Sequence, residues 1–263
     1  MIYGLYLSAS GVISSSHKQD VIANNLANAE TTGFKRDLPL FQQRMTEAQA
    51  SRVGKGRGGW SDPLLEGLGG GLLVAPHRVD VAQGSLEHTS APLDVAIQGD
   101  GYFAVSASKS ADAAGAAPMA LTRNGQFMVD ADGYIVLGSD RGQQVLDVNR
   151  QPIRARPEGG ALSVSRDGSI SQASQLIGQI GVFKVDDPGK LQKLGGTLIG
   201  YDDSAGIRRS EATVQPEFLE RSNVDPTTEL TELMKAQRLL EANAQMIRYQ
   251  DQTLGKLIEV GKI

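Results

Sequence analysis

The C-terminal segment, residues 221–263, carries the pattern that most constrains the fold of this chain. A leucine or isoleucine recurs there every seven residues, and a second series lies three or four residues away from the first. This spacing is a heptad repeat, which predicts one long amphipathic helix. The first series is Leu233, Leu240, Ile247 and Leu254, and the second, mixed in polarity, is Leu230, Gln237, Ala244, Asp251 and Ile258.

The start of this helix is marked as well. Asp225 is a typical capping residue, Pro226 suits the first helical turn, and Glu229 follows early in the helix. About 34 helical residues that rise roughly 1.5 Å each span about 50 Å. We expect a helix of that length to project from a small β domain.

The N-terminal segment, residues 1–36, has the same helical character. Two heptad series run through it, and the second consists of small residues after its first member, which lets another helix approach closely. We expect the helix to stop between Asn28 and Gly33, because Asn and Gly tolerate the left-handed backbone that ends helices. The two series are Leu5, Val12, Gln19 and Leu26, and Ile2, Ala9, Ser16 and Ala23.

Antiparallel pairing of the two terminal helices as a coiled coil is the simplest way to bury both apolar stripes. Such a pair leaves apolar flanks without cover, among them Tyr6, Ile13 and Ile22. Apolar surface of this extent needs a partner, and self-assembly supplies one. The terminal helices are therefore expected to contact further copies of the chain.

The middle of the chain, residues 76–220, shows repeated hairpin signals. Asn124-Gly125, Asp132-Gly133 and Arg166-Asp167-Gly168 each separate short apolar runs, and such turns join antiparallel strands. Gly178–Val185 predicts a further strand, and Ser106–Ala117 predicts a surface loop. The predicted fold class is α+β, with N- and C-terminal helices around a central, mainly antiparallel β domain of hairpins.

Residues 37–75 start polar and end rich in glycine. Gly54–Gly59 and Gly67–Gly71 flank Trp60, the only tryptophan. An extended linker or arm is the simplest interpretation of this segment. The chain thus divides into an N-terminal helical segment at 1–36, a linker or arm at 37–75, a β domain at 76–220 and a C-terminal helix at 221–263.

Composition narrows the classes of function. The 263 residues include 26 basic and 30 acidic side chains, a balance that argues against a dedicated nucleic-acid-binding protein. No apolar run approaches the roughly 18 residues that membrane insertion needs. The absence of cysteine excludes disulfides and Cys-ligated metals. The first residues lack the basic and apolar regions of a cleaved signal peptide, so we expect export, if any, by another route.

Patterns for catalysis or ligand binding are weak. His17, His77 and His88 are scattered, whereas a metal or catalytic cluster needs convergent ligands. Asp130–Gly133 resembles part of a calcium loop without its later ligands, and a hairpin turn explains it better. The glycine run at 67–71 lacks the Lys-Ser/Thr of a phosphate loop, and no Gly-x-Ser-x-Gly elbow occurs. We expect no catalytic, cofactor-binding or metal-binding residue, and no enzyme.

Three sets of motifs run along the chain. The N-terminal set is Val21–Asn28 followed by Thr32–Arg36, and the middle set is Leu93–Phe103 followed by Thr122–Gly125. The C-terminal set is Ser222–Asp225, Glu229-Leu230, Gln237-Arg238, Asn243–Gln245 and Gln250–Gln252. Together these motifs resemble those of the flagellar rod–hook axial family, occur in the order of that family and span nearly the whole chain.

The resemblance implies a structural subunit that polymerises into a hollow helical shaft, which transmits torque from the motor to the hook. In such proteins the terminal helices form an inner coiled-coil layer around the export channel, and the β domain lies outside it. The implied partners are further copies, other rod and hook proteins, and the flagellar type III export apparatus. The implied location is the basal-body rod in the periplasmic space, reached without a cleaved signal peptide. Enzymatic activity, cofactors, nucleic acid and membrane insertion are not implied.

The length suits a distal-rod subunit, because hook subunits usually carry an extra outer domain. Proximal-rod and hook subunits are the alternatives within the family. Outside the family, the alternatives are a monomeric β binding module on a coiled-coil stalk and an enzyme with a site in the β domain.

The residues expected at assembly interfaces combine heptad and motif positions. The asparagine and glutamine side chains of the set would form hydrogen bonds at packed interfaces and fix the register of the helices. Leaving a buried amide unpaired costs roughly 1–3 kcal/mol of stability. The alternative is that these amides cap helices or face water. The set is Leu5, Val12, Asn24, Asn25, Leu26, Asn28, Gly33, Phe34, Leu230, Leu233, Gln237, Leu240, Asn243, Ile247 and Leu254.

Overall fold

The computed structural model describes residues 2–45, 71–107, 119–138, 142–156, 159–173 and 175–260. The glycine-rich runs at 54–59 and 67–70, Trp60, and residues 108–117 of the predicted surface loop lie outside this part of the chain. The chain divides into two compact units. The helix unit contains residues 1–26, 37–77 and 226–263, and the β unit contains residues 27–36 and 78–225.

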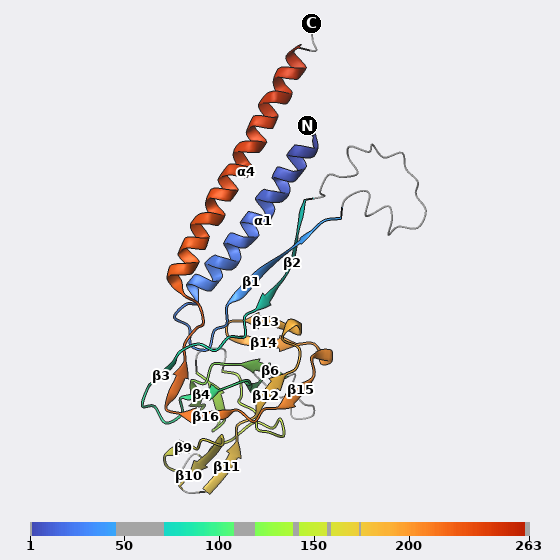
Figure 1. Ribbon diagram of the computed structural model, residues 1–263. Helices are drawn as coiled ribbons and strands as arrows, with labels where there is room; N and C mark the ends of the chain where they lie inside the picture. The colour runs from blue at the N-terminus through green and yellow to red at the C-terminus, as the bar shows by residue number, and fades with distance from the viewer. Residues whose placement is uncertain are drawn as a thin grey trace, which may run out of the picture. The chain divides into compact units, whose positions relative to one another are not determined.

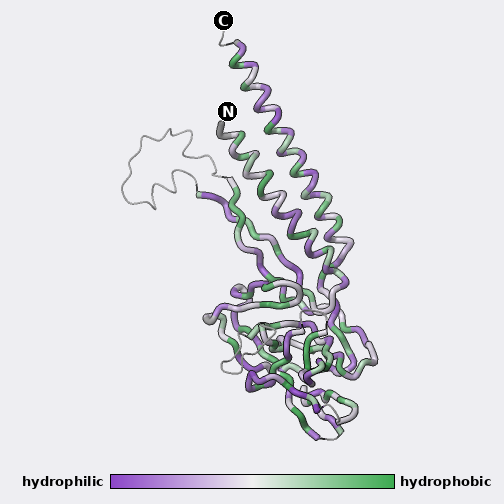
Figure 2. The backbone as a smooth tube through the Cα atoms, turned by 180° about the vertical axis from the view of Figure 1, so that it is seen from behind, coloured by the Kyte–Doolittle hydropathy of each residue, from purple (hydrophilic) through white to green (hydrophobic). Residues whose placement is uncertain are grey.

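Two long helices dominate the helix unit. Helix α1 spans Ile2–Ala27, and helix α4 spans Pro226–Val260, a length of 35 residues. Helix α4 begins directly after Asp225, as predicted, and α1 ends at Ala27, one residue before the predicted stop between Asn28 and Gly33. The helices lie side by side and run in opposite directions (Figure 1). Apolar residues recur along both (Figure 2), yet no helix in the described part of the chain is long and apolar enough to cross a bilayer.

A two-stranded sheet accompanies these helices and was not predicted. Strand β1, Asp37–Gln43, pairs with β2, Leu72–Val79, so both ends of the expected linker are strands. A reciprocal amide contact sets the start of β1. Asn25 Nδ2 donates to the Asp37 carbonyl oxygen at 2.9 Å, and Asp37 N donates to Asn25 Oδ1 at 2.9 Å.

The β unit holds the remaining strands, and every pairing between its described strands is antiparallel. One sheet has the order β13-β14-β6-β5-β12-β15, a second has the order β11-β10-β9, and the pairs β16-β4, β17-β3 and β7-β8 complete the unit. The α+β prediction is therefore confirmed. The strands are β3 Leu86–His88, β4 Val95–Gln98, β5 Tyr102–Ser106, β6 Met119–Thr122, β7 Phe127–Val129, β8 Ile135–Leu137, β9 Leu162–Val164, β10 Ser169–Gln172, β11 Gln175–Gln179, β12 Val182–Val185, β13 Leu191–Gly195, β14 Leu198–Tyr201, β15 Ile207–Arg209, β16 Thr213–Pro216 and β17 Phe218–Glu220, with short 3-10 helices at Pro188–Lys190 and Asp203–Ala205.

Strand β5 shows where the core of the β unit lies. Successive side chains of a strand point to opposite faces. Phe103 and Val105 belong to one apolar cluster, and Tyr102 and Ala104 belong to the other. All four are buried, so the six-stranded sheet carries a core on each face.

The hairpin predictions succeeded where the turn lies at the surface. Arg166-Asp167-Gly168 joins β9 to β10, and Asp132-Gly133 joins β7 to β8. Gly133 has a φ of 82°, and its N–H donates to the Asp130 carbonyl oxygen at 2.9 Å. Asp130–Gly133 is thus part of a hairpin turn.

The hairpin predicted at Asn124-Gly125 is wrong, because the strands on its two sides belong to different sheets. A Cβ at Gly125 would lie 1.6 Å from the Val95 carbonyl oxygen, so glycine here permits the chain to pass close to β4. The single strand predicted at Gly178–Val185 is also wrong. It breaks into β11 and β12 at Gly181, where a Cβ would lie 2.6 Å from the Asp147 carbonyl oxygen.

Candidate assembly site

The contact between α1 and α4 is built on two glycines of α1. A Cβ at Gly4 would lie 2.7 Å from Gln250 Nε2, and one at Gly11 would lie 2.8 Å from Asn243 Nδ2. The positions are seven residues apart on each helix, and they rise along α1 as they fall along α4. The absence of a side chain lets the amides of α4 pack directly against the α1 backbone.

A charged pair extends this contact along the two helices. Lys18 Nζ lies 2.8 Å from Glu232 Oε2, and Lys235 Nζ lies 2.7 Å from Glu232 Oε1. The hydrogen bonds from Lys18 and Lys235 lower the pKa of Glu232 to about 2. The pair is only partly buried, so we expect it to contribute on the order of 0.2–1 kcal/mol.

The packed face of α4 contains the first predicted heptad series, whose members are all partly buried. The second series was predicted one residue too late. Its members Leu230, Gln237, Asp251 and Ile258 are exposed, and only Ala244 is partly buried. The second series on this face is instead Glu229, Ala236, Asn243 and Gln250, all of which are at least partly buried. Of these, Asn243 packs against Gly11 and Gln250 packs against Gly4.

On α1, the first predicted series lies partly buried at Leu5, Val12 and Leu26. The small-residue series is divided, since Ala9 is partly buried whereas Ser16 and Ala23 are exposed. The sequence could not show which small residues of α1 face α4, because serine, alanine and glycine are frequent all round the helix. The partner packs against Gly4 and Gly11 instead.

Large apolar side chains remain exposed on both helices, and we call them the exposed apolar set. Leu239 and Met246 are 55% and 51% exposed and lie seven residues apart on α4. The predicted flanks Tyr6 and Ile13 are exposed, whereas Ile22, predicted as a third, is buried. The exposed apolar set is Tyr6, Leu7 and Ile13 on α1, and Leu230, Met234, Leu239, Met246, Tyr249, Leu257 and Ile258 on α4.

The asparagines predicted at interfaces lie in different surroundings. Asn25 is buried, and its amide is satisfied by Asp37 within the chain. Asn24 is exposed, and Asn28 Oδ1 accepts a hydrogen bond from Thr31 Oγ1 at 3.2 Å. Within the chain, Asn28 therefore has a capping role and Asn25 positions a strand, in addition to any contact with a neighbouring subunit.

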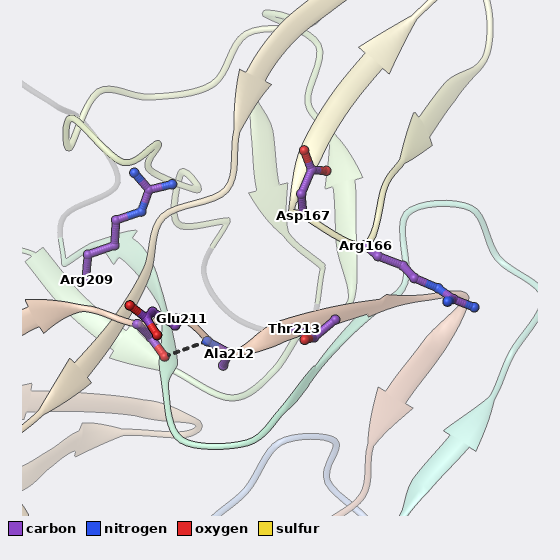
Figure 3. A pocket seen from close by; sticks show the side chains of 7 residues that line it. Arg166, Asp167, Arg209, Glu211, Ala212 and Thr213 are labelled. Atoms are coloured by element: carbon purple, nitrogen blue, oxygen red, sulfur yellow. Dashed lines mark hydrogen bonds between the residues drawn. The ribbon is translucent and has the colours of Figure 1, made fainter.

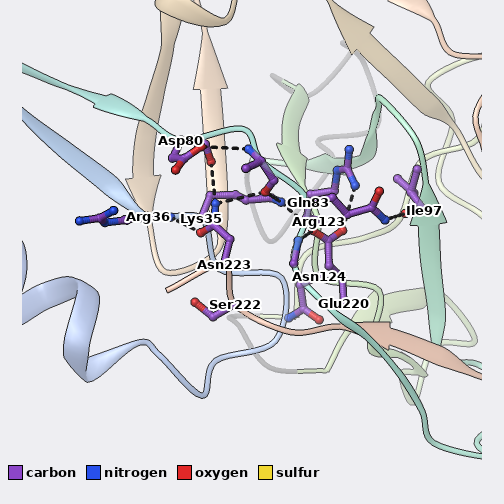
Figure 4. Close-up of polar contacts among 12 residues, drawn as sticks. Lys35, Arg36, Asp80, Gln83, Ile97, Arg123, Asn124, Glu220, Ser222 and Asn223 are labelled. Carbon is purple, nitrogen blue, oxygen red and sulfur yellow. Dashed lines mark hydrogen bonds and ion pairs between the residues drawn. The ribbon is translucent and has the colours of Figure 1, made fainter. Parts of the chain in front are cut away.

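The β unit contains a buried charge triad formed by Lys35, Arg123 and Glu220 (Figure 4). Glu220 Oε1 accepts from Lys35 Nζ at 2.6 Å, and Glu220 Oε2 accepts from Arg123 Nη1 at 2.8 Å. No member is more than 3% exposed. Burial lowers the pKa of the Lys35 ammonium below its ordinary value of 10.5, although the Glu220 carboxylate raises it.

Backbone groups and neighbouring side chains complete this site. Arg123 Nη2 donates to the Gly99 carbonyl oxygen at 2.7 Å, and the guanidinium lies 5.2 Å from the centroid of the Tyr102 ring. Burial raises the pKa of the Tyr102 phenol to about 12. Apart from Arg123 Nε, which is buried without a hydrogen-bond partner among the described residues, the charged ends of the triad are paired with one another or with backbone carbonyl oxygens.

Gly33 and Phe34, both predicted at an assembly interface, lie inside the β unit. Gly33 has a φ of 68°, and a Cβ there would lie 2.2 Å from Asn124 N. Phe34 is buried, and Lys193 Nζ lies 3.5 Å from the centroid of its ring. In this chain both residues hold the connection after α1 against the β unit.

Sequence reasoning missed the triad. Lys35 and Arg123 lie in the quoted motifs, but Glu220 lies just before the C-terminal motif. The only available signal was a single carboxylate within the apolar strand sequence Phe218-Leu219-Glu220. Local sequence cannot show that charges so far apart along the chain meet in the interior.

Among the described residues that line hollows on the surface of the β unit, the side chains do not form an arrangement typical of a catalytic site. Figure 3 shows one hollow, lined by Arg166, Asp167 and Arg209, whose side chains point in different directions. Arg209 Nη2 donates to Gln179 at 3.0 Å, and Asp167 Oδ2 accepts from Ser169 at 2.7 Å. Within the described ranges, no group of three His, Asp or Glu residues is placed to hold a metal ion.

Three family models match parts of the chain. The family described as flagella basal body rod protein matches residues 5–35. The flagellar hook protein FlgE/F/G D1 domain matches residues 96–172, and the C-terminal region of the flagellar basal body rod FlgEFG proteins matches residues 215–260. Each member of the charge triad lies in a different one of these regions.

Relatives match over nearly the full length. The flagellar basal-body rod protein FlgG of Bacillus subtilis strain 168 is 32% identical, over 99% of this chain and 99% of its own. FlgF of Mesorhizobium japonicum is 30% identical over 93% of this chain and 91% of its own. FlgF of Caulobacter vibrioides is 30% identical over 92% of this chain and 91% of its own.

Proposed function

Because this chain belongs to the family of flagellar basal-body rod proteins, we propose that its copies polymerise into the hollow helical shaft of the distal rod. The chain is a structural subunit of the basal-body rod and not an enzyme. In the proposed polymer, α1 and α4 pair as a coiled coil and form the layer around the export channel, with the β units outside. The shaft transmits torque from the motor to the hook.

The proposed partners follow from this role. Other rod and hook proteins are the neighbours at the two ends of the polymer. The flagellar type III export apparatus delivers the subunits to the periplasmic space without a cleaved signal peptide. The FlgG and FlgF relatives support a rod subunit. Within the rod we propose the distal position because the chain has 263 residues, whereas hook subunits usually carry an extra outer domain. A proximal-rod or hook position is the alternative within the family.

The exposed apolar set is the observation that carries polymerisation. Burial of a large apolar side chain contributes about 1.5–3 kcal/mol, so covering the half-exposed Leu239 and Met246 yields roughly 1 kcal/mol each. Several such side chains on two helices provide enough surface for contacts with more than one neighbour. A second copy of the chain offers a matching apolar surface.

Leu239→Asp tests this proposal. The variant places a charge at an exposed position and should leave the isolated chain folded, while the charge opposes burial against a neighbour. Cells in which this variant is the only copy should lack complete rods, counted by electron microscopy of isolated basal bodies. Leu239→Met keeps the apolar surface and should assemble normally. Normal rods with Leu239→Asp would contradict the proposal.

The position within the rod needs a second experiment. Basal bodies in which this subunit is labelled would distinguish the distal from the proximal position.

A further inference from the structure

Three connections of the chain meet at Glu220. The β unit receives the chain after α1 through residues 27–36, receives it again after β2 through residues 78–85, and releases it before α4 through residues 217–225. The Glu220 carbonyl oxygen accepts from Gly33 N at 2.7 Å, and Glu220 Oε1 accepts from Gly84 N at 2.9 Å. One residue of the last connection thus bonds to both of the others.

The side chains around Glu220 repeat the same cross-links. Lys35 Nζ donates to the Ala82 carbonyl oxygen at 2.6 Å as well as to Glu220. Asn223 Oδ1 accepts from Arg36 N at 2.7 Å, and Asn223 Nδ2 donates to the Asp80 carbonyl oxygen at 3.2 Å (Figure 4). Each connection is therefore bonded to the other two.

Arg123 ties this set to the sheet. It directly follows β6 of the six-stranded sheet, and its guanidinium bonds to Glu220. A carboxylate buried between two cations is costly to separate from either, because the interior screens charge poorly and solvates it poorly. Opening any one connection would expose or unpair part of the triad.

We propose that the Lys35–Glu220–Arg123 triad is a lock that makes the three connections one cooperative unit and attaches that unit to the six-stranded sheet. None of the connections then opens unless the others open with it. The lock belongs to the free chain, so it goes beyond the proposed polymerisation and does not depend on it. The subunit would carry its connections already folded before any neighbour binds to its helices.

Lys35→Met tests the lock by removing one cation of the triad. Arg123 and Glu220 then remain as a neutral pair, so the β unit should still fold. Amide hydrogen exchange of the full chain, followed by NMR, should show about tenfold lower protection at Gly33, Gly84 and Arg221 together. Val145, whose N–H donates to the Ile135 carbonyl oxygen at 2.8 Å in the core, should keep its protection.

Lys184→Met is the matched control. Lys184 also forms an ion pair, at 2.7 Å with Asp100, but both of its members are largely exposed. This variant should leave the protection of all four amides unchanged. Reduced protection at Gly33 alone in Lys35→Met would show that the connections open independently and would overturn the proposal. Equal loss at Val145, or an unfolded β unit, would overturn it too, because the triad would then have no separable role.

Discussion

The β unit and the helix unit differ in how far they bury apolar and charged side chains. In the β unit, apolar clusters lie on both faces of the main sheet, and the charges of Lys35, Arg123 and Glu220 are paired in the interior. In the helix unit, large apolar side chains remain in solvent, and the Lys18–Glu232 pair is only partly buried. The β unit has a buried core on both faces of its main sheet and exposes only scattered large apolar side chains such as Met128, Leu176 and Leu194, whereas both long helices of the helix unit expose them repeatedly along their length.

The difference assigns separate tasks to the two units. A closed core gives the β unit a stability that does not depend on concentration. In the proposed polymer, apolar helix surface becomes stabilising only when neighbours cover it, so the order of the helices should depend on assembly. Mutations in the two units should therefore fail in different ways.

Glu220→Ala should have the largest effect, because it leaves two buried cations without a counter-charge. We expect the free energy of unfolding of the β unit to fall by about 3–5 kcal/mol. Urea unfolding followed by near-ultraviolet circular dichroism measures this loss. The control is Glu87→Ala, which removes an exposed pair with Arg221 at 3.7 Å and should change stability by less than about 0.5 kcal/mol. Equal effects of the two variants would remove the contrast between buried and exposed charge.

Gly11→Leu should have an intermediate effect confined to the helix unit. The new side chain would meet the Asn243 amide and should cost the α1–α4 contact about 1–3 kcal/mol. Loss of helical signal on heating, with the β unit unchanged, is the expected readout. Gly255 on α4 has no heavy atom within 4 Å of an ideal Cβ, so Gly255→Leu should not weaken the contact. If both variants behave alike, the glycine seam is not where the helices pack.

Lowering the pH should have the smallest effect on the stability of the helix unit. The pKa of Glu232 is lowered to about 2 in the folded chain. Its pair with Lys18 therefore stabilises the helix unit above the unfolded pKa of about 4.3, and this contribution is lost as pH falls toward 2. Glu232→Gln should remove that part of the pH dependence, amounting to roughly 0.2–1 kcal/mol. An unchanged acid titration of helix stability in Glu232→Gln would show that this pair contributes nothing.

Local signals predicted the helices well. The cap at Asp225 and the Asn-rich stop after Ala27 depend on neighbouring residues, so the boundaries of α4 and α1 follow from sequence. The register between the helices did not follow. Heptad counting favours large apolar residues, but the observed contact places amides against Gly4 and Gly11.

In the β unit, prediction failed where the backbone approaches another segment. Gly125 and Gly181 resemble ordinary turn and strand glycines, but in each case a distant carbonyl oxygen occupies the space of a side chain. The charge triad could not be predicted from the sequence for a similar reason. Lys35, Arg123 and Glu220 are far apart along the sequence, and only the folded chain brings them together.

The central claim is that the helices are incomplete in a single chain while the β unit is complete. Amide hydrogen exchange of the full chain, measured as a dilute monomer and again within isolated rods, tests it most directly. The account predicts slow exchange in the core strands of the β unit in both states, and exchange in α1 and α4 that slows strongly only in the rod. Helices that are as protected as the sheet in the dilute monomer, with no change on assembly, would contradict it.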